Sequence, residues 1–66
     1  MIVYRPVDPN DDEQDSSIAY EDLDSAKASL GMEYTWEIWT NLTGKHVGYE
    51  TNEGWSGPYI EIITIA

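Results

Sequence analysis

The sequence contains no cysteine, which excludes disulfide bonds and thiolate metal sites. It has only three basic residues against thirteen acidic ones, and the net charge at pH 7 is −10. Because binding to phosphate needs clustered Lys and Arg, this balance argues against direct contact with nucleic acid or with an anionic membrane. It favours a basic protein as the partner, since the field of the whole chain attracts positive surfaces.

Long apolar runs are missing as well. No stretch approaches the roughly 20 apolar residues of a membrane-spanning helix, and residues 1–6 lack the basic flank and apolar stretch of a secretory signal. We therefore expect a soluble protein of the cytoplasm. With 66 residues, 41% of them apolar, we expect residues 1–66 to form one small domain.

The spacing of apolar residues predicts one helix after an acidic loop. Residues 8–17 are rich in Asp, Asn, Ser and Pro and almost devoid of apolar side chains, so we expect a loop there. Apolar residues then recur at intervals of three and four, which places them on one helical face. This face contains Ile18, Ala19, Leu23, Ala26 and Leu30, with Ser16, Ser17 or Asp22 as the N-cap and Gly31 at the C-terminal end.

Four further segments have the period of two that is typical of strands. They are residues 2–7, 33–41, 46–51 and 59–65. A glycine-containing turn at residues 41–45 joins the second and third into a hairpin. The predicted fold class is α+β, with the order β-α-β-β-β and one helix packed on an antiparallel or mixed sheet.

One helix covers only one face of such a sheet, yet apolar residues occur on both faces. Trp39 points away from Trp36, and isoleucines alternate onto both faces of residues 59–65. An apolar surface on the second face predicts a partner-binding site or a homodimer. The alternative is that the loop around Trp55 folds over this surface.

Candidates for catalysis are few. His46 is the only histidine, and a general base would need a nucleophile and an orienting acid beside it, so we expect a solvated turn residue. Glu37, Glu50 and Glu61 could line neighbouring strands, but a small sheet has little room for the cleft that a catalytic carboxylate pair needs. We therefore expect these acids to keep the sheet soluble, and we expect a protein that is not an enzyme.

A metal or cofactor is not expected either. Asp8, Asn10 and Asp12 match the first ligand positions of an EF-hand loop. Glu13, however, stands where that loop needs glycine, and Ala19 stands where it needs a bidentate glutamate. The glycines form no phosphate-binding pattern.

Acidic residues are concentrated near the N-terminus, where residues 8–24 hold eight carboxylates and no base. A compact chain of this length is roughly 28 Å across, and duplex DNA of that length carries about 16 phosphate charges. The net charge of −10 therefore gives over half the charge density of the duplex. Carboxylates at strand and helix spacings stand in for a row of phosphates in a basic groove.

Three interpretations of this charge are open. The chain acts as a decoy in the nucleic-acid site of a basic protein, or it is adapted to concentrated salt, or it is an acidic adaptor or structural phage protein that binds through an apolar sheet face. In the decoy interpretation, carboxylates supply the charge and aromatic residues supply the anchors. The partner-binding residues would be Asp11, Asp12, Glu13, Asp15, Glu21, Asp22, Asp24, Trp39 and Trp55.

The size, the predicted element order, the acid excess and turns such as NLTGKHVGYE, residues 41–50, resemble the small inhibitors that bacteriophages encode against host defence. Anti-CRISPR proteins of the DNA-mimic type are the most similar group. The resemblance implies stoichiometric, non-enzymatic inhibition in the host cytoplasm. Such a protein would cover the DNA-binding surface of a CRISPR surveillance complex subunit, with a type I complex as the preferred target.

Overall fold

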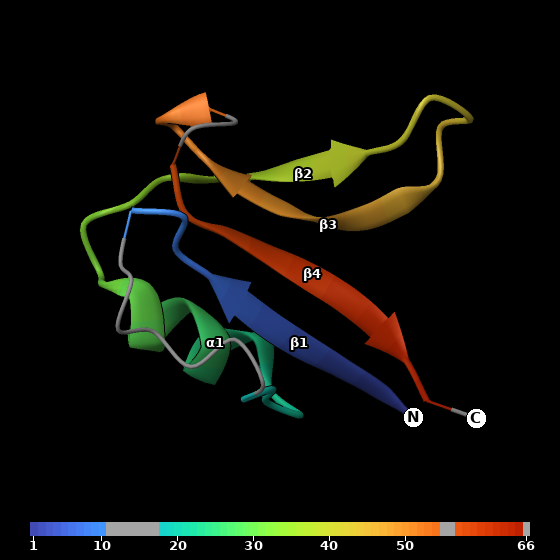
Figure 1. The fold of residues 1–66 in the computed structure, drawn as a ribbon, viewed down its shortest axis with the longest axis horizontal. Coiled ribbons are helices and arrows are strands. Elements are labelled where there is room, and N and C mark those ends of the chain that lie inside the picture. Colours follow the sequence, from blue (N-terminus) through green and yellow to red (C-terminus); the bar gives the residue numbers. More distant parts are fainter. Residues whose placement is uncertain (11–17, 55–56, 66) are drawn as a thin grey trace.

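The structure is a computed structural model, and it describes residues 1–10, 18–54 and 57–65. The predicted α+β class and the order β-α-β-β-β are confirmed (Figure 1). None of the described segments contains a helix with the length and apolar character needed to cross a membrane. The elements are β1 (Ile2–Val7), α1 (Leu23–Leu30), β2 (Trp36–Thr40), β3 (His46–Thr51) and β4 (Tyr59–Thr64).

The four strands form one antiparallel sheet with the spatial order β1-β4-β3-β2. β2 and β3 make the predicted hairpin, whose turn is held by the side chain of Asn41. Its Oδ1 accepts hydrogen bonds from the backbone N–H groups of Thr43 and Lys45, each at 3.0 Å. β1 and β4 pair along their whole length, and the N–H of Ile65 donates to the carbonyl of Met1 at 2.8 Å. The start of β1 and the end of β4 therefore lie side by side (Figure 1).

The ladder in the middle of the sheet is short. β3 and β4 share three register pairs, between residues 48–50 and 59–61, whereas β1 and β4 share six and β2 and β3 share five. Beyond these three pairs the strands diverge, and Figure 1 shows the β2–β3 hairpin turning away from the β1–β4 pair. The sheet is thus two ribbons joined by a short ladder, which we call the central ladder.

The helix begins later than the apolar periodicity predicts. The pattern places Ile18 and Ala19 on the helical face, whereas α1 begins at Leu23. Tyr20 makes two backbone hydrogen bonds to Tyr4, of 2.7 and 2.8 Å, and these form an isolated bridge on the outer edge of β1. The prediction that residues 18 and 19 are helical is wrong. The chain here pairs with the backbone of β1 through Tyr20, and it does not follow the local helical pattern.

Both ends of α1 are capped by residues that the sequence offers for this role. Asp22 Oδ2 accepts hydrogen bonds from the N–H and the Oγ of Ser25, at 3.2 and 3.0 Å. Gly31 has a φ of 124°, a conformation that favours glycine, and its N–H donates to the carbonyl of Lys27 at 3.2 Å. The helix packs against β1 and buries Ala26 completely.

Candidate partner-binding face

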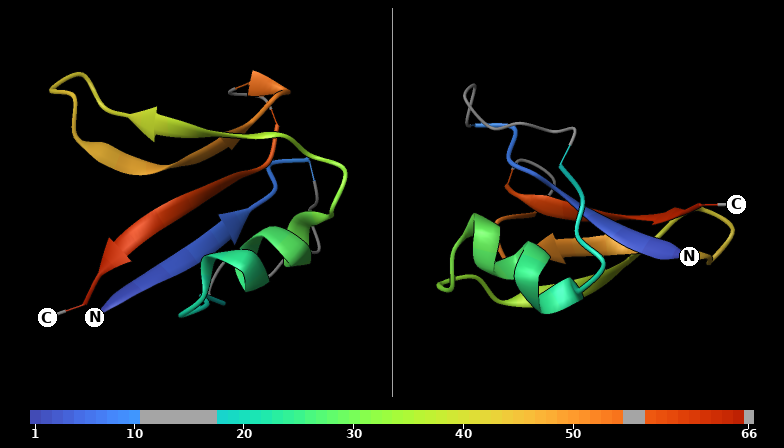
Figure 2. Two further views of the ribbon diagram at one scale, coloured as in Figure 1. Left: turned by 180° about the vertical axis from the view of Figure 1, so that it is seen from behind. Right: turned by 90° about the horizontal axis from the view of Figure 1, so that it is seen from below.

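The register of the sheet aligns residues from all four strands in rows. Paired residues of an antiparallel sheet point to the same side, so each row lies on one face. On one of the two faces, α1 packs beside the sheet, and the opposite face is called the free face (Figure 2). In the order β1, β4, β3 and β2, its two central rows are Arg5, Glu61, Gly48 and Trp39, and then Val7, Tyr59, Glu50 and Glu37.

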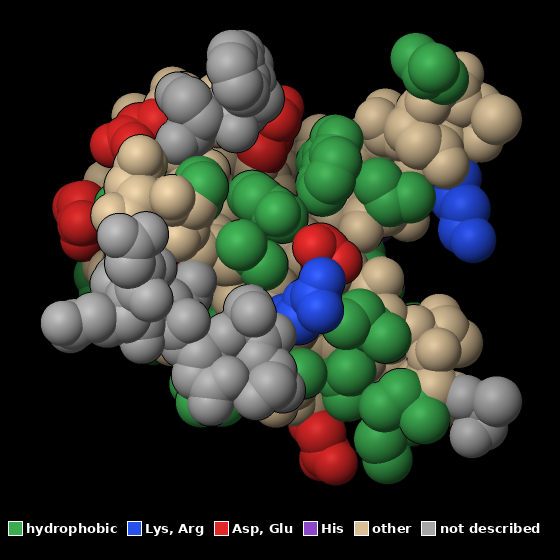
Figure 3. All heavy atoms as spheres, viewed as in Figure 1, with side chains coloured by type: hydrophobic (Ala, Val, Ile, Leu, Met, Phe, Trp, Pro, Cys, Tyr) green, Lys and Arg blue, Asp and Glu red, His purple; other side chains and the backbone are tan. Residues whose placement is uncertain are grey.

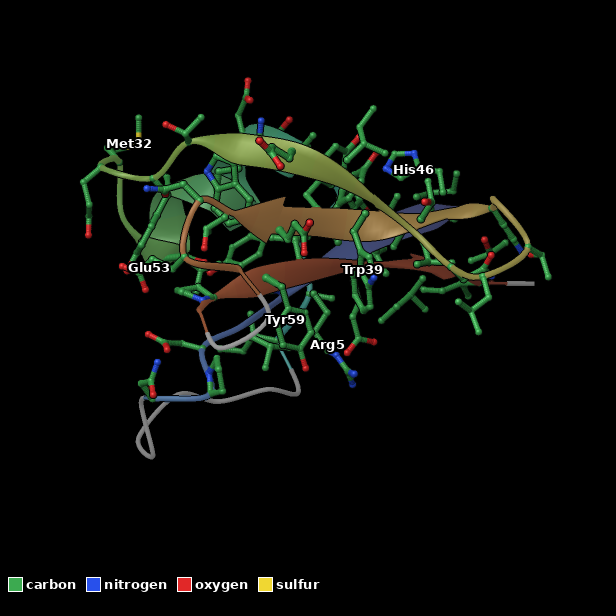
Figure 4. All side chains as sticks on the ribbon, turned by 90° about the horizontal axis from the view of Figure 1, so that it is seen from above. Arg5, Met32, Trp39, His46, Glu53 and Tyr59 are labelled. Atoms are coloured by element: carbon green, nitrogen blue, oxygen red, sulfur yellow. The ribbon has the colours of Figure 1, made fainter. Side chains whose placement is uncertain are left out.

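Two aromatic side chains meet on the free face across β3. Trp39 of β2 and Tyr59 of β4 are in edge-to-face contact, with ring centroids 5.7 Å apart and an interplanar angle of 76°. Trp39 is 37% exposed, so much of its ring faces solvent. Figure 4 shows Trp39, Tyr59 and Arg5 on the same side of the sheet, away from α1.

Gly48 leaves room for the indole ring of Trp39. It is the register partner of Trp39, and a Cβ at this position would come within 3.0 Å of Trp39 Cε3 and would collide with the backbone carbonyl of Ile60. Its φ is not positive, so the requirement is for space and not for an unusual backbone conformation. Any larger residue here would displace the indole or the neighbouring strand.

A pocket of about 260 Å³ opens beside the rings. Among the described residues it is lined by Trp39, Glu50, Gly54 and Tyr59, which combine two aromatic surfaces with one carboxylate. Glu50 and Tyr59 are themselves partners in the central ladder. The space-filling view shows hydrophobic side chains gathered over this face, around an adjoining basic and acidic pair (Figure 3).

Two carboxylates stand directly opposite each other on this face. Glu37 of β2 and Glu50 of β3 are register partners, and like charges in this position destabilise a sheet. Neither takes part in a salt bridge within residues 1–10, 18–54 and 57–65. The free face thus carries negative charge that the described part of the chain does not neutralise by ion pairing.

The third carboxylate of the face is neutralised. Arg5 Nη2 donates to Glu61 Oε2 at 2.8 Å, in an ion pair whose side chains are each about a third exposed. Arg5 Nε is buried and has no hydrogen-bond partner in the described part of the chain. Glu37, Glu50 and Glu61 do lie on neighbouring strands, as the sequence allowed, but the third is engaged by Arg5.

Carboxylates outside the free face also act on Tyr34. Burial and then the carboxylates of Glu53, Glu33 and Asp8, in order of decreasing effect, raise the pKa of Tyr34 above its ordinary value of 10.0. The negative charge of these three carboxylates therefore disfavours ionisation of the phenol. They come from the residue that follows β1, the segment after α1 and the turn before β4, and none of them belongs to the partner-binding set predicted from the sequence.

The predicted partner-binding residues occupy different parts of the molecule. Glu21 and Asp24 are exposed near the beginning of α1, and Asp22 is the helix cap, whereas Trp39 is on the free face. The structure does not bring these three acids together with Trp39 on one face. The remaining predicted residues, Asp11, Asp12, Glu13, Asp15 and Trp55, lie outside the described residues.

His46 is exposed, but its ring also contacts other residues of β3. Its Nε2 is 2.9 Å from the carbonyl oxygen of Gly48, and the ring packs edge to face on Tyr49 with centroids 4.8 Å apart. Within the described ranges no group of three or more His, Cys, Asp or Glu side chains is arranged to hold a metal ion.

Sequence reasoning missed Gly48, Tyr59 and Gly54 as parts of a site. A glycine inside a strand is a recognised sign of close approach by another group, and this signal was available at Gly48. The contribution of Tyr59 depends on the register between β3 and β4, which no local pattern specifies.

Comparisons with protein-family models, with curated proteins and with solved structures gave no match to this chain.

Proposed function

We propose that this chain is a non-enzymatic protein that binds a basic, nucleic-acid-binding partner and covers its positively charged surface. The observation that carries the proposal is the free face, where an aromatic pocket stands beside the opposed carboxylates Glu37 and Glu50. The net charge of −10 adds a long-range attraction to positive surfaces. Both features favour a cationic partner and oppose a nucleic acid.

The opposed carboxylates support binding over mere solubility. Many positions on a small surface can carry charge without loss, whereas a directly opposed pair of like charges lowers the stability of the sheet. A cation supplied by a partner offsets this repulsion. The two carboxylates, which destabilise the free chain, therefore attract the partner in the complex. Aromatic residues beside the carboxylates provide the anchors that dominate interface energies.

A capture experiment from bacterial lysate at low and high salt tests this function. We expect basic nucleic-acid-binding proteins to be retained at low salt and released as salt rises, because screening weakens the attraction between the charged surfaces. Added duplex DNA or RNA should compete with the chain for the same partner. If the retained proteins are the same at low and high salt, and with and without competing nucleic acid, the proposal is contradicted.

An inhibitor of host defence is the narrower form of this proposal, acting in the host cytoplasm on a type I CRISPR surveillance complex. It is supported by the resemblance in size, acid excess and element order. Purified complex should lose target-DNA binding when one equivalent of the chain is added. Unchanged DNA binding would rule out this complex as the target, and the broader proposal of a basic partner would still stand.

An acidic adaptor that binds through apolar surface is the second candidate. It is favoured by the aromatic surface of the free face, where Trp39 is 37% exposed beside Tyr59. A homodimer through the same surfaces belongs to this candidate. Binding of this kind would change little with salt, which separates it from the first candidate.

A further inference from the structure

We propose that the pocket between Trp39 and Tyr59 receives the guanidinium group of an arginine from the partner, with Glu50 as its counter-ion. This inference rests on the proposed function, because the arginine belongs to the basic partner. It adds the chemical group that is recognised and the place where it binds. The pocket lies on the free face and is lined by Trp39, Glu50, Gly54 and Tyr59.

The aromatic lining favours a flat cation. In an edge-to-face pair such as Trp39 and Tyr59, one ring keeps its faces clear of the other, and Trp39 remains 37% exposed. An aromatic face attracts a cation through its quadrupole, most strongly when the ring is an indole. Guanidinium is planar and weakly hydrated, so it stacks on such a ring more readily than a lysine ammonium does.

The position of Glu50 supplies the second half of the site. Its carboxylate lines the pocket and is half-buried, and it has no salt-bridge partner in the described part of the chain. A carboxylate accepts two parallel N–H bonds from guanidinium, which fixes the orientation of the arginine. Glu37 stands opposite Glu50 in the register but does not line the pocket, and it strengthens the local negative potential.

The dimensions fit a single side chain. Sites that hold drug-sized molecules have volumes of roughly 300–1,000 Å³, and this pocket is smaller, at about 260 Å³. An arginine that projects from a protein surface would fill the pocket while the surrounding surfaces meet. The charge of the chain, −10, is complementary to a partner that is rich in such residues.

Calorimetric titration with an arginine nonapeptide tests the site, with matched variants of the two opposed carboxylates. We expect Glu50→Gln to weaken binding by about tenfold and Trp39→Leu by about fivefold, while Glu37→Gln changes it by about twofold or less. Both glutamine variants remove the same charge from the same face, so a difference between them belongs to the pocket. In NMR spectra, titration with Nα-acetyl-arginine methylamide should shift the Trp39 indole N–H, and the norleucine analogue should not.

Other outcomes overturn the inference in distinguishable ways. If the peptide binds but the two glutamine variants behave alike, the pocket assignment is wrong and the proposed function stands. If the wild-type chain does not bind the peptide at low salt, both fail. An equal pocket-dependent affinity for a lysine nonapeptide overturns the choice of arginine, and dimerisation that Trp39→Leu abolishes would assign the pocket to a second copy of the chain. Because Glu50→Gln is a conservative change, the test holds even if Trp39→Leu does not fold.

Discussion

Trp39 and Tyr59 meet edge to face across β3, and the indole of Trp39 lies against Gly48 of that strand. The ring centroids are 5.7 Å apart, and a Cβ at Gly48 would come within 3.0 Å of Trp39 Cε3. The contact joins β2 to β4, which are not neighbours in the sheet. Both rings line the pocket on the free face, so the pocket depends on this contact.

Replacement of Gly48 by alanine should destabilise the fold. The new Cβ would collide with the carbonyl of Ile60, and relief of such overpacking costs about 1–3 kcal/mol of the free energy of unfolding. In an unconstrained strand the same change would instead be favourable, by roughly 0.5–1 kcal/mol. Urea unfolding gives the sign directly, with Thr40→Ala at the exposed end of β2 as the control. A Gly48→Ala variant as stable as wild type would contradict the close approach.

Replacement of Glu37 by lysine should stabilise the fold. The change converts the opposed pair with Glu50 into a pair of opposite charges, for a gain of about 0.2–1 kcal/mol. Glu37→Gln removes the repulsion without adding an attraction and should give a smaller gain. Thermal unfolding at low and high salt measures both effects, and salt should reduce them. Equal melting temperatures for wild type and both variants at low salt would show that the two carboxylates do not repel each other.

Two variants of Asp22 separate its structural role from its predicted role in binding. Asp22→Ala removes the acceptor for Ser25 and should lower the free energy of unfolding by about 0.5–2 kcal/mol. Asp22→Asn keeps a good N-cap residue and removes the charge, so it should leave stability nearly unchanged. If Asp22 also contacts a basic partner, Asp22→Asn should lower the affinity in a binding titration although the fold keeps its stability. Affinity that is unchanged in Asp22→Asn would restrict this residue to capping.

The raised pKa of Tyr34 predicts a loss of stability at alkaline pH. The folded chain binds the phenolic proton more tightly than the unfolded chain, whose pKa is near 10.0. The contribution is therefore present below pH 10.0 and is lost as the pH rises through the pKa of the folded chain. The difference between the ultraviolet titrations of wild type and Tyr34→Phe isolates this group. An ionisation step at or below pH 10.0 in that difference would refute the effect of burial and of Glu53, Glu33 and Asp8.

The acidic segment predicted from the sequence is tested by changing Asp11, Asp12 and Asp15 together to lysine. The substitution should abolish binding to a basic partner, because three attractive charges become repulsive. Circular dichroism should show an unchanged fold, and the corresponding triple asparagine variant should lose part of the affinity only. Full-strength binding by the lysine variant would show that this segment is not the charged mimic.

The sequence predicts most of the fold because local patterns are strong there. Residues 2–7 and 46–51 are rich in residues that favour strands, and they form β1 and β3 with the predicted bounds. Gly31 and Asp22 both take the capping roles that their chemistry favours. The predicted strand over residues 33–41 is longer than β2, which begins at Trp36.

The site could not be predicted to the same extent, because it depends on contacts between distant segments. The start of the helix is decided by hydrogen bonds between Tyr20 and Tyr4, which no local pattern contains. The pocket requires the register that places Tyr59 beside Glu50, and this register follows from the packing of the whole sheet. The sequence did indicate that Trp39 points away from Trp36. It did not indicate which residues would accompany Trp39.

The central ladder gives the pocket a mechanical consequence. One of its three pairs joins Glu50 to Tyr59, and both residues line the pocket, while Trp39 belongs to the ribbon on one side of this ladder and Tyr59 to the ribbon on the other. An occupant of the pocket holds the two ribbons together, since it touches both. A ligand that binds there stabilises the folded sheet by its free energy of binding. A tighter-binding ligand therefore raises the free energy of unfolding further.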